Sequence, residues 1–186
     1  MRAFWPTIRR PLQLMLWLAG GLLGLRTSAQ SVGADLPALR KLYAAAVVEE
    51  AASRQFVAVV RAYHGSDAAV IGYCGVAEAV QARYFWSPLA KLRAVREAQR
   101  QFSRAVALDP QNVEVRFLRF SVESHVPRYL GYSQHLADDR IIILRGAQHY
   151  TSLGLNASSL RLIRDFMLLH GDCSAAEARV LRAMTP

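Results

Sequence analysis

Hydrophobic residues recur at three- and four-residue spacing along almost the whole chain after residue 35, which is the period of an amphipathic helix. Asp35 is a candidate N-cap with Pro37 in the first turn, and a stripe follows at Leu39, Leu42, Tyr43, Ala46 and Val47. A second stripe is out of phase with the first and consists of Phe56, Val59, Val60 and Tyr63. The change of phase predicts a break near residues 49–53, with one long helix as the alternative.

Helix-stopping and helix-capping residues divide the remaining chain into further helices. His64-Gly65-Ser66 ends the second stripe, and Ser66 or Asp67 can cap a helix over 68–84. Pro88 opens a helix that Asp109-Pro110 ends near Leu108. Later helices are predicted over 113–126, after Ser133 as a cap, and after the capping box Ser174-x-x-Glu177.

The pattern therefore predicts an all-α fold, because no stretch alternates like a strand and the connections are short. We expect one domain over residues 36–186, built as an antiparallel array of about six or seven helices in hairpins. Within helix 68–84, the small residues Gly72, Gly75, Ala79 and Ala82 step along one side. Glycine disfavours a helix interior, so these positions predict close approach of neighbouring helices.

The N-terminus has the composition of an export signal. Arg2, Arg9 and Arg10 precede an apolar stretch over residues 12–25, and Thr27-Ser28-Ala29 offers small residues for cleavage. The sequence thus predicts a cleaved signal peptide over 1–29, a linker over 30–35 and a periplasmic or secreted product. Retention of the apolar segment as an anchor is the alternative.

The net charge of the chain and its distribution narrow the range of partners that we expect. The formal charge is +9, and removal of residues 1–29 leaves 19 basic and 14 acidic residues. The remaining arginines are spread among apolar residues rather than clustered, so we expect no nucleic-acid partner. The small positive excess is consistent with weak association with an anionic membrane surface.

Two cysteines remain after cleavage. Cys74 and Cys173 could form a disulfide in an oxidising compartment, and the alternative is a pair of buried or unpaired thiols. The histidines are scattered and no Cys/His cluster has ligand spacing, so the sequence predicts no metal and no cofactor.

Ala98, Phe102, Ala105 and Pro110 follow the spacing of small, aromatic, small and terminating residues in the second helix of a tetratricopeptide repeat, and the chain resembles a divergent array of this type. The chain also resembles a family of small exported bacterial proteins with no assigned activity. That likeness rests on Asn112-x-Glu114-x-Arg116-Phe117-Leu118-Arg119, on Pro127-x-x-Leu130-Gly131-Tyr132 and on the acids Asp138–Asp139. It implies a helical-repeat fold and supplies no reaction.

The helix over 113–126 carries the most unusual chemistry. Its apolar residues cover two opposite sides, so it should be sandwiched in the array, while Arg116, Arg119 and Glu123 fall on the seam between those sides. Arg119 and Glu123 are four residues apart and can touch. Asp138 or Asp139 can point back to the arginines. These features predict an ion-pair cluster that locks two helices together.

The alternative for the same residues is a ligand site. Arg116, Arg119, Glu123, Tyr132 and Asp139 would then bind a small anionic ligand or serve a small enzyme, although no nucleophile accompanies them. Pro127, Leu130 and Gly131 are expected to shape the adjoining turn. The sequence as a whole favours a non-enzymatic role, in which the array binds or scaffolds a protein or peptide partner.

Overall fold

A computed structural model describes residues 35–185, and within this range the chain forms eight α-helices, two short 3₁₀ helices and no strand. The all-α prediction is confirmed. The predicted signal peptide over 1–29 and all but the last residue of the linker lie outside the described residues. The elements are α1 (Leu36–Ala46), α2 (Glu50–Arg61), α3 (Ala68–Ala82), α4 (Pro88–Leu108), α5 (Val113–Glu123), η1 (Arg128–Leu130), α6 (Leu136–Gln148), η2 (Tyr150–Ser152), α7 (Ala157–His170) and α8 (Ala175–Ala183).

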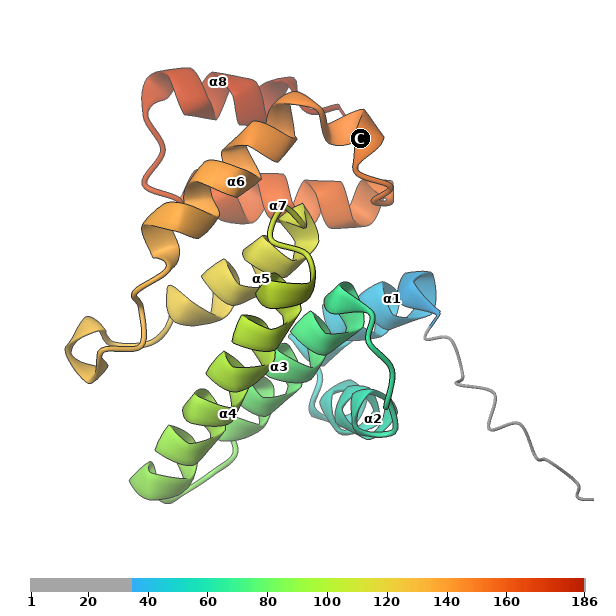
Figure 1. Cartoon of the computed structure of the whole chain (residues 1–186), viewed down its shortest axis with the longest axis vertical. Coiled ribbons are helices and arrows are strands. Elements are labelled where there is room, and N and C mark those ends of the chain that lie inside the picture. Colours follow the sequence, from blue (N-terminus) through green and yellow to red (C-terminus); the bar gives the residue numbers. More distant parts are fainter. Residues whose placement is uncertain (1–34, 186) are drawn as a thin grey trace, which may run out of the picture.

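Helices that are consecutive in the sequence pack against each other as pairs, α1 with α2, α3 with α4, α5 with α6 and α7 with α8. Figure 1 shows the α3–α4 hairpin running toward one end of the long axis and α6, α7 and α8 gathered at the other. The structure has eight helices where six or seven were predicted. The chain breaks at 47–49, between α1 and α2, close to the break predicted near 49–53, and a turn at 171–174 separates α7 from α8.

Most helices begin where a local side chain caps them. The caps Asp35, Asp67, Asn112 and Ser174 each accept a backbone N–H from the first turn, and Ser174 completes the predicted capping box with Glu177. The prediction that Ser133 caps α6 is wrong. The Ser133 hydroxyl instead donates to the backbone oxygens of Glu123 and Val126, and α6 starts after His135 without a local cap.

Helix α5 lies between two layers, as its two apolar sides predicted. On one side Val115 and Leu118 reach α3, where a Cβ added to Gly72 would lie 3.2 Å from Leu118 Cδ1. On the other side Phe117 packs edge-on against Phe166 of α7, with ring centroids 5.5 Å apart. The helix ends at Glu123 rather than at the predicted residue 126.

The α3–α4 interface contains the small and aromatic residues that the repeat-like spacing singled out. Ala98, Phe102 and Ala105 are buried, and a Cβ on Gly75 would come within 2.9 Å of Phe102 Cε1. The absence of a side chain at Gly75 is therefore what allows the two helices to approach. Pro110 lies in the turn that follows α4.

Candidate functional site

Arg116, Arg119 and Asp139 form a buried ion cluster between α5 and α6. Arg119 donates through Nε and Nη2 to the two carboxylate oxygens of Asp139 at 2.7 and 2.6 Å, and Arg116 Nη1 donates to the same carboxylate at 2.9 Å. Asp139 is 0% exposed and Arg119 4%. Arg116 also donates through Nε and Nη2 to the backbone oxygen of Pro110, which ties the cluster to the α4–α5 turn.

This geometry identifies Asp139, rather than Asp138, as the acid that meets the two arginines. Both guanidinium groups point at a carboxylate of the same protein, and among the described residues every buried side-chain polar atom has a hydrogen-bond partner. Satisfied donors in a dry interface are what a stable buried ion pair requires. The cluster therefore joins two helices, α5 and α6.

Glu123 and Tyr132 have partners outside the ion cluster. The Glu123 carboxylate accepts the backbone N–H of His135 at 3.0 Å and lies 2.7 Å from His135 Nδ1, so it contacts the start of α6 instead of Arg119. Tyr132 accepts a hydrogen bond from Arg96 Nε of α4 at 2.7 Å. The five predicted ligand-binding residues thus do not surround a common opening.

The turn after α5 adopts the shape that glycine permits. Pro127 precedes η1, and Gly131 ends it with a φ of +73°, in the left-handed region that a side chain disfavours. Leu130 is 41% exposed at the surface of this turn. The turn carries the chain from Glu123 to His135, the two residues that meet at the base of α6.

Sequence reasoning missed a second buried polar cluster. Glu114, at the start of α5, accepts two hydrogen bonds from Arg40 of α1 and one from the Tyr73 hydroxyl of α3, at 2.7, 2.7 and 2.8 Å. The hydrogen bonds that Arg40 donates to Glu114 raise the pKa of Arg40, and burial together with the Glu114 charge raises the pKa of Tyr73. The only local signal was an acid between Val113 and Val115 on an apolar side of the helix.

An apolar groove of about 580 Å³ is lined by residues of α1, α3, α4, α5 and α7. Arg83, Lys91 and His125 are the ionisable groups at its edges apart from Tyr43, and none of the described residues that line it is acidic. A neighbouring hollow of about 200 Å³ shares Tyr43, Phe117 and Leu162 and ends at the Arg40–Glu114 pair. The groove is lined by Tyr43, Val47, Val76, Ala79, Val80, Ala82, Arg83, Lys91, Val95, Phe117, Ser121, Val122, His125, Val126, Pro127, Leu130, Leu162 and Phe166.

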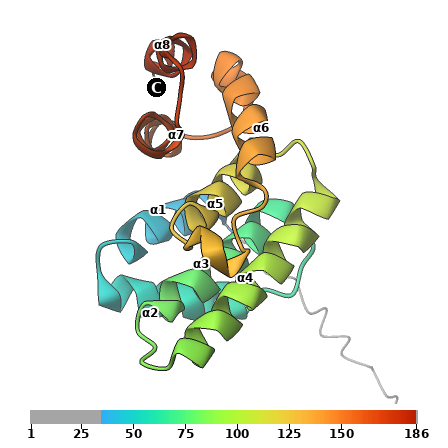
Figure 2. The same cartoon turned by 90° about the vertical axis from the view of Figure 1, so that its left-hand side faces the viewer.

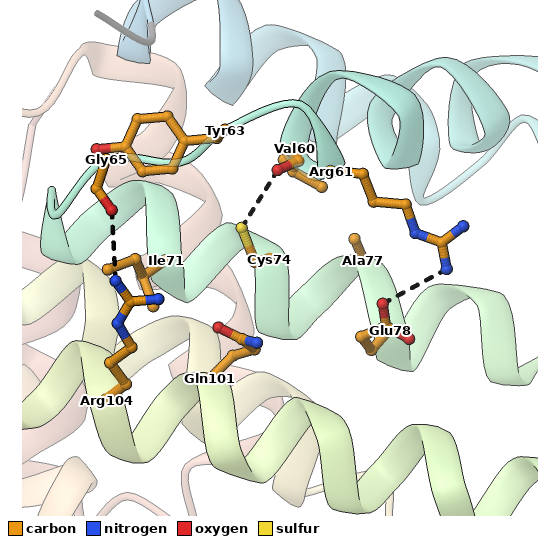
Figure 3. A pocket seen from close by; sticks show the side chains of 10 residues that line it. All are labelled: Val60, Arg61, Tyr63, Gly65, Ile71, Cys74, Ala77, Glu78, Gln101 and Arg104. Carbon is orange, nitrogen blue, oxygen red and sulfur yellow. Dashed lines mark hydrogen bonds and ion pairs between the residues drawn. The ribbon is translucent and has the colours of Figure 1, made fainter. Parts of the chain in front are cut away.

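Two other hollows are less informative. One of about 740 Å³ lies between α1 and α2, is also apolar, and is bordered by both Asp35 and Lys41, so its charge favours no partner. The other, of about 180 Å³, lies between α2, α3 and α4, where Cys74 is flanked by Arg61 and Arg104 (Figure 3). The α1–α7 groove is the concave surface whose chemistry is distinctive, because its ionisable edge groups include no acid.

Of the two alternatives that the sequence left open for the cysteines, the structure has the unpaired thiols. Cys74 and Cys173 are both free thiols, and their sulfur atoms donate to the backbone oxygens of Val60 and Met167, respectively. Burial raises the pKa of both thiols. A thiol rather than a thiolate is a poor nucleophile, so the Cys74 pocket in Figure 3 lacks an activated group.

Within residues 35–185, no group of three or more His, Cys, Asp or Glu side chains is placed to hold a metal ion, and no helix is long and apolar enough to cross a membrane. Comparison with known proteins gives no match to a protein family, to a curated protein or to a solved structure.

Proposed function

We propose that this protein is an exported helical-repeat-like binding protein that holds a segment of a partner protein in the α1–α7 groove. The observation that carries the proposal is an apolar floor with cationic edges and no acid among the described lining residues. Helices distant in sequence combine to make this surface, as they do in arrays of stacked hairpins. Export rests on the composition of residues 1–29.

The chemistry of the groove favours an amphipathic helix with acidic flanks as the occupant. Apolar side chains spaced at i, i+3, i+4 and i+7 would pack on the partly exposed Val95, Val122 and Leu162, as in other helix-in-groove complexes. Acidic residues beside that stripe would lie near Arg83 and Lys91. Attraction between the cationic rim and an acidic partner increases the association rate, and the same cations disfavour basic segments.

The competing proposal, that Arg116 and Arg119 hold a small anionic ligand, is less favoured. Asp139 already neutralises both guanidinium groups at hydrogen-bonding distance. An incoming anion would have to displace a carboxylate that is 0% exposed. We therefore assign these arginines a structural role.

Fluorescence anisotropy with a synthetic helix tests the groove. The probe is a labelled peptide of about four helical turns, with leucine at the apolar positions and glutamate on both flanks. Leu162→Asp, which places a charge in the groove, should weaken binding by at least about tenfold. Leu169→Asp is the matched control, because Leu169 lies on the same helix, is 77% exposed and does not line the groove.

The charge of the partner is tested separately. Reversal of Lys91 to glutamate should weaken binding of the glutamate peptide, whereas Arg93→Glu, two residues along α4 and outside the groove lining, should not. A peptide with lysine in place of glutamate should bind poorly to the unaltered protein. Equal binding of the two peptides, or undiminished binding by Leu162→Asp, would refute the proposal.

A further inference from the structure

The turn between α3 and α4 exposes an unusual set of large apolar side chains. Trp86 is 100% exposed, Leu89 55% and Tyr84 45%. We call residues 84–89 the hairpin tip. Figure 1 shows this turn at one end of the molecule's long axis, opposite α6, α7 and α8, so the tip is free to meet a flat surface.

Helix capping fixes the hairpin tip in place. The Ser87 side chain accepts the backbone N–H of Ala90, and Pro88 occupies the first turn of α4. The backbone N–H of Phe85 donates to Ala82, which closes the end of α3. Trp86 therefore projects from a defined turn between two helix ends, even though no part of the described protein covers it.

In the sequence, the charged residues nearest to the hairpin tip are cations, and the first acids on either side are Glu78 and Glu97. Residues 79–96 contain Arg83, Lys91, Arg93 and Arg96 and no acidic residue. The Arg83 guanidinium lies 6.0 Å from the centre of the Tyr84 ring. Tryptophan and tyrosine favour the boundary between lipid headgroups and acyl chains, and nearby cations are attracted to anionic headgroups.

We infer that the hairpin tip docks on an anionic membrane surface, with Trp86 in the headgroup region and Arg83, Lys91 and Arg93 facing the lipid phosphates. A second copy of the chain is a poorer occupant, because pairing two identical tips would bring like charges together. The hairpin tip shares Arg83 and Lys91 with the rim of the peptide groove. The inference does not rest on the groove binding a partner, because its test uses Trp86 and Arg93, neither of which lines the groove.

Trp86 fluorescence tests the inference directly. Trp5→Phe and Trp17→Phe in the full chain leave Trp86 as the only tryptophan of the three in the sequence. With vesicles of phosphatidylcholine and phosphatidylglycerol, its emission should shift to the blue and be quenched by lipids brominated near the headgroup. With phosphatidylcholine alone the emission should stay that of an exposed tryptophan, and added salt should reverse the shift.

This design distinguishes docking of the hairpin tip from membrane insertion of the apolar segment over residues 12–25. Insertion of that segment would bring the chain to both kinds of vesicle, but Trp86 would report lipid contact only if the tip itself docks. An unshifted emission on anionic vesicles would overturn the inference. A blue shift that grows with protein concentration in the absence of vesicles would also overturn it, in favour of self-association.

A charge reversal supplies the matched control. Arg93→Glu, in the hairpin, should reduce the Trp86 shift by several-fold, whereas Arg182→Glu in α8 changes the net charge equally at the far end of the molecule and should leave the shift nearly intact. Both arginines are exposed. Equal losses in the two variants would mean general attraction of a basic protein to lipid, and the assigned role of the tip would fail.

Discussion

At the scale of residues, the core of this protein is distinguished by three buried carboxylates that belong to α5 and α6. Glu114, Glu123 and Asp139 are each at most 6% exposed. Removing a carboxylate from water is costly unless charged or hydrogen-bonding partners replace the water. The partners come from other elements: Arg40 of α1, His135 before α6, and the arginines of α5. Each pair therefore fixes how two elements meet.

Asp139→Asn should destabilise the protein by about 3–5 kcal/mol, because it leaves Arg116 and Arg119 buried opposite a neutral amide. Chemical denaturation monitored by circular dichroism measures the loss. Asp138→Asn is the matched control: Asp138 is the adjacent residue of α6 but is exposed, so its effect should stay within about 0.5 kcal/mol. Equal stability of the two variants would show that the ion cluster contributes nothing.

The sequence could place the arginines on the seam of α5 but could not choose between Asp138 and Asp139. Helical periodicity gives the relative direction of side chains within one helix. Which acid faces the neighbour depends on the rotation of α6 about its own axis. Contacts between residues far apart in sequence, such as Glu123 with His135, contribute to that rotation. The same limit explains why Arg119 and Glu123, correctly spaced to touch, have separate partners.

At the scale of elements, the helix starts that sequence predicted well are those with a local cap. Asp35, Asp67 and Ser174 act within their own first turns, so a short stretch of sequence contains the whole interaction. Helix α6 was predicted with the wrong cap because its first backbone groups are met by Glu123, twelve residues earlier. The sequence pattern around the start of α6 does not reveal such a distant partner.

Removal of the capping box should weaken α8. The Ser174 hydroxyl accepts from Glu177 N and also donates, with its backbone N–H, to the Glu177 carboxylate. Ser174→Ala should lower the free energy of unfolding by about 1 kcal/mol. Ser103→Ala, in the exposed interior of α4, should be neutral or slightly stabilising, since alanine is the better helix former.

The effect of Ser174→Ala should also depend on pH. Hydrogen bonds from Ser174 lower the pKa of Glu177 below its ordinary value of 4.5, because they favour the charged carboxylate. A depressed pKa gives stability that is present above the ordinary value and is lost as the pH falls through the folded-state value. The difference in Tm between the unaltered protein and Ser174→Ala should therefore narrow below about pH 4.5. A difference in Tm that stays constant or widens at acidic pH would contradict this assignment.

At the scale of the whole molecule, the groove could not be derived from sequence, because it depends on how hairpins stack. Its lining combines side chains from α1, α3, α4, α5 and α7, which come from different parts of the chain. Figure 2 shows α5 between α7 and the α3–α4 hairpin. The repeat-like spacing at Ala98, Phe102 and Ala105 describes a single helix and says nothing about the curvature of the array. Composition predicted a binding role, whereas the location and charge of the surface required coordinates.

The main hydrophobic cluster extends from Leu39 in α1 to Met184 after α8 and includes residues of all eight helices, while Ile71, Ala105 and Val115 form a second, small cluster. A main core that all the helices share predicts that they unfold together. Met167 of α7 is 0% exposed within the main cluster, so Met167→Ala should cost about 2–5 kcal/mol. Leu169→Ala, two residues further along the same helix and 77% exposed, should cost far less.

Calorimetry and hydrogen exchange together distinguish a cooperative molecule from one with a separable C-terminal part. In Met167→Ala, a single calorimetric transition should shift to lower temperature. The slowest-exchanging amides of α1 and α3 should lose as much protection from hydrogen exchange as those of α7, because both regions open through the same global unfolding. Two transitions, or faster exchange confined to α6, α7 and α8, would show instead that the Asp139 ion cluster joins two units that unfold separately.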